Sequence, residues 1–165
     1  MRLLTLFALA ATASVAGAQP DSTQIPALLC ATLGVVREQW PLGRVVLDRV
    51  AIDTTKRLAP DLLSRREHRN PEDWARAHRV EAVQSELAQP VCQLGSTQCA
   101  MREDIVASIA FADPAIVGDS ARVIVRTAEN VGGAIAHVSI TVEELTLRRS
   151  DDGWRVTGRR IRART

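Results

Sequence analysis

Four polar side chains that can move protons or donate hydrogen bonds recur at every second position late in the chain: His137, Ser139, Thr141 and Glu143. If this segment is a strand, these residues share one face of a sheet. An imidazole, two hydroxyls and a carboxylate within reach of one another can carry out acid–base chemistry. His137 and Glu143 are therefore the candidate catalytic residues. The alternate residues from 136 to 142 are apolar, however, so we expect them to meet the helices and expect His137 to face solvent or a second subunit.

The other two histidines carry weaker signals. His68 lies in a run of charged residues, and His78 lies off the main apolar face of a predicted helix, so both are expected at the surface. The chain has no Gly-x-Ser-x-Gly nucleophile motif. It also lacks the glycine patterns that bind phosphates or dinucleotides, and no cofactor is expected.

Three cysteines, Cys30, Cys92 and Cys99, follow the amino-terminal apolar segment. In an oxidising compartment a disulfide is expected. Three pairings are open, and we favour Cys92–Cys99 because Gly95 and Ser96 allow the chain to turn between them. The spacing matches no zinc pattern and no histidine lies near, so no metal site is expected.

The carboxyl end is basic. From Leu147 to Thr165 there are seven arginines against two aspartates, a local charge of +5. Such a surface could bind an anionic polymer, membrane head groups or an acidic partner. We favour the alternative of a solvated edge strand, because the aromatic residues that stack on single-stranded nucleic acid are missing. No nucleic-acid partner is expected. The anion-binding candidates are Arg159, Arg160, Arg162 and Arg164.

The amino terminus has the three parts of an export signal: Arg2, an apolar core from Leu3 to Ala11, and small residues at Ala16-Gly17-Ala18. We predict a signal peptide over residues 1–18, and a mature protein in the periplasm or outside the cell. A second small-residue motif at 11–13 is a less favourable cleavage site. The apolar core is shorter than the roughly 20 residues of a membrane span, so no stable membrane anchor is expected.

The remaining residues, 19–165, predict a single α+β domain, with helices in its first half and strands in its second. Apolar residues at helical spacing predict a helix from Pro26 to Trp40, and the Val- and Ile-rich run from Arg44 to Ile52 predicts a strand. One helical turn is expected around Asp61 to Arg65. A long helix is expected from Asn70 to Pro90, with Asn70 as its cap and acidic residues in its first turn.

Alternating apolar residues in the second half predict antiparallel strands separated by turns at Gly118, Gly132-Gly133 and Gly153. The apolar parity changes near Glu143-Glu144 and again near Gly158, which predicts two β-bulges. Bulged strands curve, so we expect the helices to fill the hollow side of a cone-like, curved antiparallel sheet of four to five strands.

Two segments resemble the nuclear-transport-factor-like (cystatin-like) α+β superfamily: Ala112 to Val123, and the ending Leu147 to Val156 with its acidic Asp-Gly-Trp turn. The resemblance covers Glu103 to Ile161. It implies helices packed into a curved sheet. The superfamily includes isomerases, dehydratases, polyketide cyclases and binding domains, so the fold does not decide the function. Its enzymes carry Tyr, Asp or His residues in the pocket, and this chain has no tyrosine.

The sequence therefore predicts an exported binding or association module without chemistry of its own. One alternative is a small-molecule isomerase, dehydratase or cyclase that uses the hollow between sheet and helices. Another is an anion-binding surface formed by the terminal arginines. A homodimer through the outer sheet face is a further expectation, and no particular ligand or partner follows from the residues.

Overall fold

The computed structural model describes residues 23–53, 63–92, 99–131 and 137–165, with the backbone alone at 63–65 and 92. The predicted signal peptide and its cleavage site lie outside these residues, as does the Gly132-Gly133 turn. The elements, in chain order, are α1 (Gln24–Arg37), β1 (Arg44–Asp48), β2 (Val50–Ile52), β3 (Leu63–Glu67), α2 (Pro71–Arg76), β4 (Glu81–Val83), α3 (Ser85–Ala88), β5 (Val91–Cys92), β6 (Cys99–Ala100), β7 (Ile105–Phe111), β8 (Ala115–Val117), β9 (Ser120–Val131), β10 (His137–Ser150) and β11 (Gly153–Arg164).

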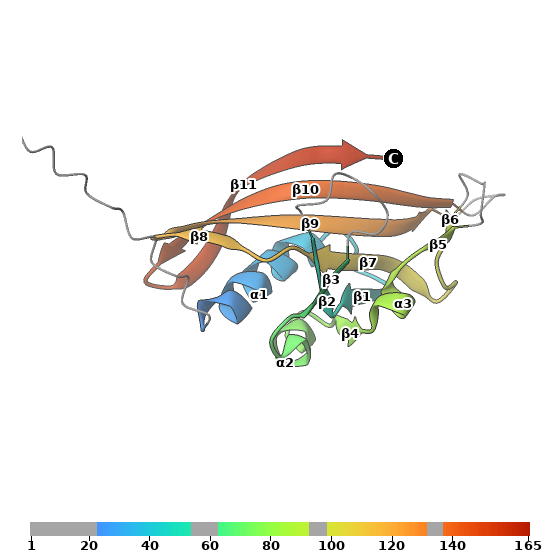
Figure 1. Cartoon of the computed structure of the whole chain (residues 1–165), viewed down its shortest axis with the longest axis horizontal. Helices are drawn as coiled ribbons and strands as arrows, with labels where there is room; N and C mark the ends of the chain where they lie inside the picture. The colour runs from blue at the N-terminus through green and yellow to red at the C-terminus, as the bar shows by residue number, and fades with distance from the viewer. Residues whose placement is uncertain (1–22, 54–62, 93–98, 132–136) are drawn as a thin grey trace, which may run out of the picture.

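The fold is α+β and is dominated by one mixed sheet of seven strands (Figure 1). Its order is β11-β10-β9-β7-β1-β4, and β8 pairs with β9 outside this path. β1 runs parallel to both β4 and β7, and the other pairings in this sheet are antiparallel. The prediction of four to five antiparallel strands was wrong, because the sheet has seven strands and β1 lies in parallel between β4 and β7.

The helices are not gathered at the start of the chain as predicted. α1 precedes the sheet, but α2 and α3 are short helices that lie between strands. In the segment around Asp61 to Arg65, expected to form a helical turn, residues 63–65 belong to strand β3, and residues 54–62 are outside the described part.

The long helix predicted from Asn70 to Pro90 ends early. α2 stops after Arg76, and Arg79 takes a left-handed conformation with φ of 58°. The Val80 amide donates to the Ala75 carbonyl and the Arg79 amide to Arg76, which is a Schellman-type ending. Glycine is the usual residue at such a helix end, so the sequence, with an arginine at this position, does not indicate that the helix stops here. At the other end Asn70 makes no side-chain cap hydrogen bond.

One face of the sheet is covered by α1, which lies along β9 and β10 in Figure 1. The helix buries a single stripe of residues, as its 3.6-residue period predicts. This stripe meets β-branched and leucine side chains of β9 and β10, and Trp154 of β11 completes the same cluster. The main core consists of Leu28, Leu29, Leu33, Val36, Val123, Val125, Leu145, Leu147, Trp74, Trp154 and their neighbours.

The opposite face of the sheet is also covered, over part of its area. Val46, Ile105 and Ala128 form a second cluster with residues of α3 and β4, and Val138 and Ile140 of β10 pack against it. Both faces of the central strands are therefore apolar in places, as in sheets that are buried on two sides. The apolar parity of β10 changes because its two ends are covered on different faces.

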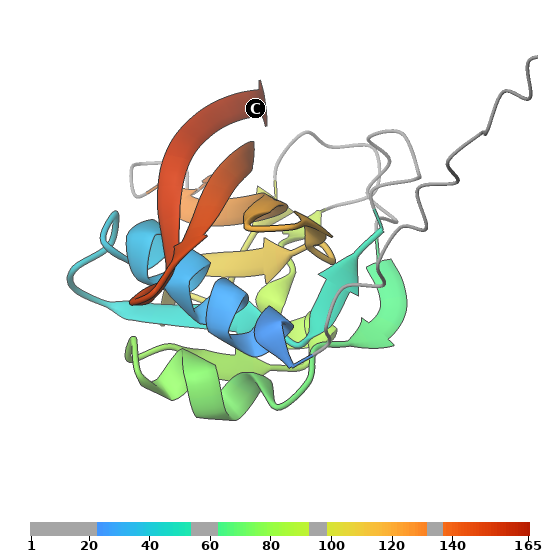
Figure 2. The ribbon, with the colours of Figure 1, turned by 90° about the vertical axis from the view of Figure 1, so that its left-hand side faces the viewer.

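Strand β11 forms one edge of the sheet and curves strongly with β10 (Figure 2). Its register against β10 shifts between Val142 and Glu143 and again between Thr146 and Leu147. Both shifts lie where bulges were predicted. The extra residues, however, are Thr157 and Arg162 of β11, while β10 pairs with β9 without any shift.

Candidate functional site

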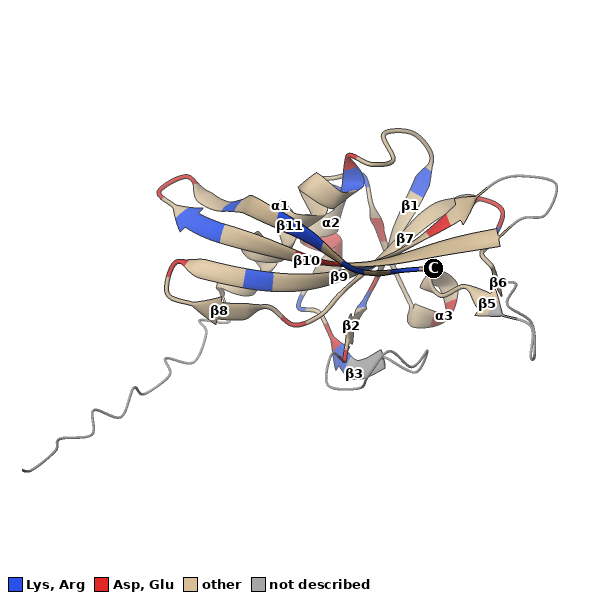
Figure 3. Cartoon of the chain, turned by 90° about the horizontal axis from the view of Figure 1, so that it is seen from above, with Lys and Arg blue, Asp and Glu red and all other residues tan. Residues whose placement is uncertain are grey.

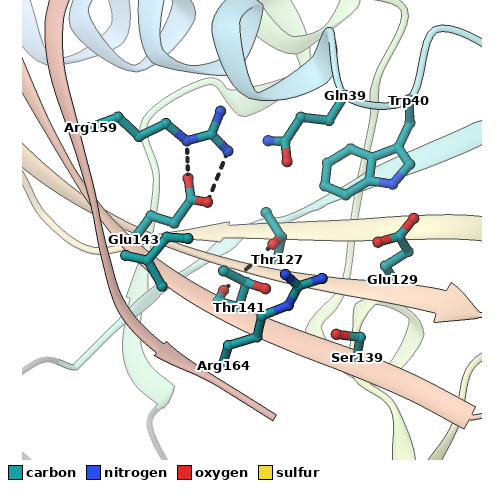
Figure 4. Close-up of a pocket in the computed structure, with 10 residues that line it drawn as sticks. Gln39, Trp40, Thr127, Glu129, Ser139, Thr141, Glu143, Arg159 and Arg164 are labelled. Carbon is teal, nitrogen blue, oxygen red and sulfur yellow. Dashed lines mark hydrogen bonds and ion pairs between the residues drawn. The ribbon is translucent and has the colours of Figure 1, made fainter.

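The best-defined candidate site is a pocket of about 360 Å³ on the α1 side of the sheet, beyond the end of the helix. The turn after α1 forms one wall, and β9, β10 and β11 form the floor and the other wall (Figure 4). The lining is mostly polar or charged and consists of Gln39, Trp40, Thr127, Glu129, Ser139, Thr141, Glu143, Arg159, Ile161 and Arg164.

A carboxylate–guanidinium pair occupies one end of the pocket. Glu143 Oε2 accepts a hydrogen bond from Arg159 Nε at 2.7 Å, and Oε1 accepts one from Nη2 at 2.8 Å. The Glu143 side chain is only 5% exposed, whereas that of Arg159 is 38% exposed. Two parallel charge-assisted hydrogen bonds fix the guanidinium plane. The pair is therefore a preorganised, electrically neutral wall of the pocket.

The neutral polar groups of the pocket are largely used within the protein. Thr127 Oγ1 donates to the Thr141 carbonyl at 3.5 Å, and Ser139 Oγ donates to the Thr165 carbonyl at 3.1 Å. Gln39 Nε2 donates to the Val36 carbonyl at 3.2 Å. These bonds hold the lining in place.

The structure does not bring His137 and Glu143 together. Both lie on one face of β10, but they are six residues apart, about 20 Å along a strand. His137 is exposed and lies outside the pocket, whereas Glu143 is buried in it. His137 is exposed and Val138 and Ile140 pack on a core cluster, as expected, but this assignment holds only at this end of β10. Further along, the face of His137 and Glu143 meets the α1 cluster through Leu145 and Leu147.

The four candidate anion-binding arginines do not form one cationic surface. Blue segments follow β11 toward the carboxyl terminus in Figure 3. Arg159 pairs with Glu143, and Arg162 pairs with Glu144, which holds the pKa of that carboxyl below its usual value. Arg164 lines the pocket and Arg160 is exposed.

His68 is buried, against our expectation, with 7% of its surface exposed. Its ring packs edge-on against Trp74 and Phe111, with ring centroids 6.2 and 6.3 Å away. Burial lowers the pKa of His68, because a charged imidazole would lose its hydration there. Within the described structure its Nε2 atom has no hydrogen-bond partner. Because its neighbours in the sequence are charged, the sequence did not indicate that His68 lies in the core.

His78 is half-buried and lies beside the free cysteine. Cys30 Sγ is 3.2 Å from His78 Nε2, and the same thiol donates to the Trp74 carbonyl at 3.7 Å. Burial raises the pKa of the Cys30 thiol, which favours the protonated form over the nucleophilic thiolate. The contact therefore joins α1 to the end of α2 and is better suited to packing than to nucleophilic chemistry.

A second buried charge lies on the other face of the sheet. The fully buried Asp48 carboxylate accepts hydrogen bonds from the Val50 amide at 2.8 Å and from Ser85 Oγ at 2.9 Å. Burial raises the pKa of Asp48, and these bonds and the charge of Arg126 oppose that shift. Asp48 ends an apolar strand, and no sequence motif marked it.

The register places Cys92 opposite Cys99 in the β5–β6 pair. Cys99 is disulfide-bonded and Cys30 is a free thiol. The side chain of Cys92 is not among those that the structure describes, so the described residues do not show the partner of Cys99. The Cys92–Cys99 bond therefore stays a prediction.

Within the described ranges, no group of three or more His, Cys, Asp or Glu side chains is arranged to hold a metal ion. Among the same residues, no helix has the length and apolar character needed to cross a membrane.

Comparisons of the chain with protein-family models, with curated proteins and with solved structures gave no match. The function is therefore inferred from the pocket itself. Sequence analysis missed Trp40, Thr127 and Glu129 as parts of a site, because they come from a turn and a strand that meet Glu143 only in the folded sheet.

Proposed function

We propose that this protein is a binding module that holds a small polar molecule in the pocket between the turn after α1 and strands β9, β10 and β11. The observation that carries the proposal is the lining: one indole, hydroxyls and two charges of each sign surround about 360 Å³. Pockets of roughly 300–1,000 Å³ are typical of small-ligand sites, which are mostly apolar; the polar and charged lining of this pocket therefore favours a polar ligand.

Most polar groups of the pocket already form hydrogen bonds within the protein, which favours binding over catalysis. A proton-transfer group must be able to exchange its proton with a substrate, but both Glu143 oxygens accept hydrogen bonds from Arg159. A prebuilt, rigid lining lowers the cost of ordering side chains when a ligand enters.

The enzymatic alternative would rest on Glu129, because that carboxylate lines the pocket and forms no ion pair within the described part of the chain. An isomerase or dehydratase using Glu129 would convert the bound compound, whereas a binding module returns it unchanged. The anion-surface alternative is weakened by the pairing of Arg159 and Arg162 with glutamates.

The proposal can be tested by thermal unfolding of the full chain with separate panels of sugars, amines, carboxylates, amino acids and nucleosides. A ligand at 100 times its Kd stabilises the fold by about 2.7 kcal/mol. For a chain of this size, this raises Tm by roughly 5–10 °C. Incubation followed by mass spectrometry then shows whether the compound is recovered unchanged.

Ile161→Trp and Val117→Trp form a matched pair of variants. Both residues are exposed, at 57% and 78%, but Ile161 lines the pocket and Val117 lies in β8. A bound compound should stabilise the wild type and the Val117 variant, and stabilise the Ile161 variant much less. Equal stabilisation of both variants, or no stabilisation by any panel, would refute the pocket as the binding site.

A further inference from the structure

We propose that the molecule held in this pocket is a zwitterion, a free amino acid or a similar small amino-carboxylate, with its carboxylate on Arg164 and its ammonium group on Glu129. This inference rests on the proposed function and adds the chemical class of the ligand. It starts from two opposite charges, Glu129 and Arg164, that line the same pocket. Within the described residues, neither forms an ion pair or a side-chain hydrogen bond.

The other two charges in the pocket cannot serve the same purpose without breaking strong contacts. Glu143 and Arg159 satisfy each other through two hydrogen bonds of 2.7 and 2.8 Å. A ligand that displaced this pair would have to leave a buried charge without its partner, which is costly. Charge recognition therefore falls to Glu129 and Arg164.

The register explains how these two side chains come to share a pocket. Glu129 of β9 lies opposite Ser139 of β10, and Arg164 of β11 lies opposite Thr141 of β10. The two residues thus flank β10 on opposite sides and are offset by two positions. Strand spacing and rise place their backbones about 12 Å apart, and within the described residues no ion pair joins the two charged groups.

Figure 4 shows the Arg164 side chain extending across the floor of the pocket toward Thr127, with Glu129 below Trp40. An ammonium group held by Glu129 would lie close to the indole ring, and aromatic faces attract such cations. A guanidinium offers two parallel donors to a carboxylate. The pocket thus presents an acceptor and an aromatic surface at one side and a planar double donor at the other.

A ligand with one charge would fit this arrangement poorly. A simple carboxylate would bind Arg164 but would meet the negative charge of Glu129, and a simple amine would bind Glu129 but would meet Arg164. Like charges brought together in a partly desolvated site repel strongly. Discrimination by repulsion as well as attraction is a general source of binding specificity.

The test is isothermal titration calorimetry of the full chain with the twenty common L-amino acids, followed by two derivatives of the best binder. The amide lacks the carboxylate, and the N-acetyl derivative lacks the ammonium group. We expect each derivative to bind at least tenfold more weakly than the amino acid.

Variants assign the two contacts. Arg164→Gln should weaken amino-acid binding at least tenfold and remove the preference over the amide, and Glu129→Gln should do the same for the N-acetyl derivative. Arg160→Gln is the matched control, because Arg160 is an exposed arginine of β11 outside the pocket. It should bind like the wild type. Unfolding curves that match the wild type show that the variants fold.

The outcomes separate this inference from the proposed function. Binding of a sugar, a nucleoside or a singly charged compound in the pocket, without binding of any amino acid, overturns the zwitterion and leaves the binding module standing. Equal affinity for an amino acid and its two derivatives also overturns it. Failure of every panel refutes both proposals.

Discussion

The two partners of the Glu143–Arg159 pair differ in burial, so their replacement should destabilise the fold by different amounts. Replacing Arg159 by glutamine leaves a carboxylate whose side chain is only 5% exposed. Breaking one side of a buried pair costs about 3–5 kcal/mol. Because glutamine can still donate one hydrogen bond, we expect the lower end, about 3 kcal/mol. Glu143→Gln instead leaves a guanidinium that is 38% exposed, so we expect the loss of charge-assisted bonds alone, about 1.5 kcal/mol.

Urea unfolding of both variants and of the double variant measures these costs and the coupling between the two residues. Arg155→Gln is the control on the same strand, because its pair with Asp152 is 67% and 75% exposed and should contribute under about 1 kcal/mol. If Arg159→Gln destabilised the protein no more than Arg155→Gln, the pair could not be the fixed wall described above. A larger cost for Glu143→Gln would reverse the assignment of the buried partner.

Three further results are expected. Trp154→Ala should cost about 3–5 kcal/mol in thermal or urea unfolding, because the indole is buried in the main core; a loss below about 1 kcal/mol would contradict that placement. A non-reducing peptide map should show Cys92 linked to Cys99 and Cys30 as a free thiol, and any bond to Cys30 would contradict the prediction. Because burial lowers the pKa of His68 in the folded state, the unfolded chain binds more protons between that pKa and about 6.5. Stability should therefore fall as pH decreases through this window, and His68→Phe should remove that part of the slope; equal pH slopes in both proteins would refute it.

The sequence predicted correctly those elements that bury one face and expose the other, because burial of a single face sets the spacing of the apolar residues. α1 buries a single stripe, and β9 alternates between buried and more exposed residues from Ser120 to Thr127, so periodicity alone located them. The turn at Gly153 was also predicted, and its φ of 105° explains the need for glycine. Local chemistry was sufficient at these places.

Prediction failed where tertiary contacts decide the outcome. Val80 and Val83 continue the apolar spacing of α2, but they reach the core from a turn and from strand β4. β10 is covered on different faces at its two ends, so alternation could not show which face meets α1. The pocket depends on pairings between β9, β10 and β11 that bring Glu129, Glu143 and Arg164 together from distant positions.

The interrupted register of β11 has a consequence for how these molecules behave at high concentration. An exposed edge strand can recruit a strand of another chain and begin aggregation. The two bulges divide β11 into regular stretches of four, four and two residues against β10. Each is shorter than the five to six residues of an ordinary strand. The opposite edge, β4, has three residues. Both edges of the sheet thus offer an incoming strand too little regular backbone to dock on, which favours a protein that stays dispersed.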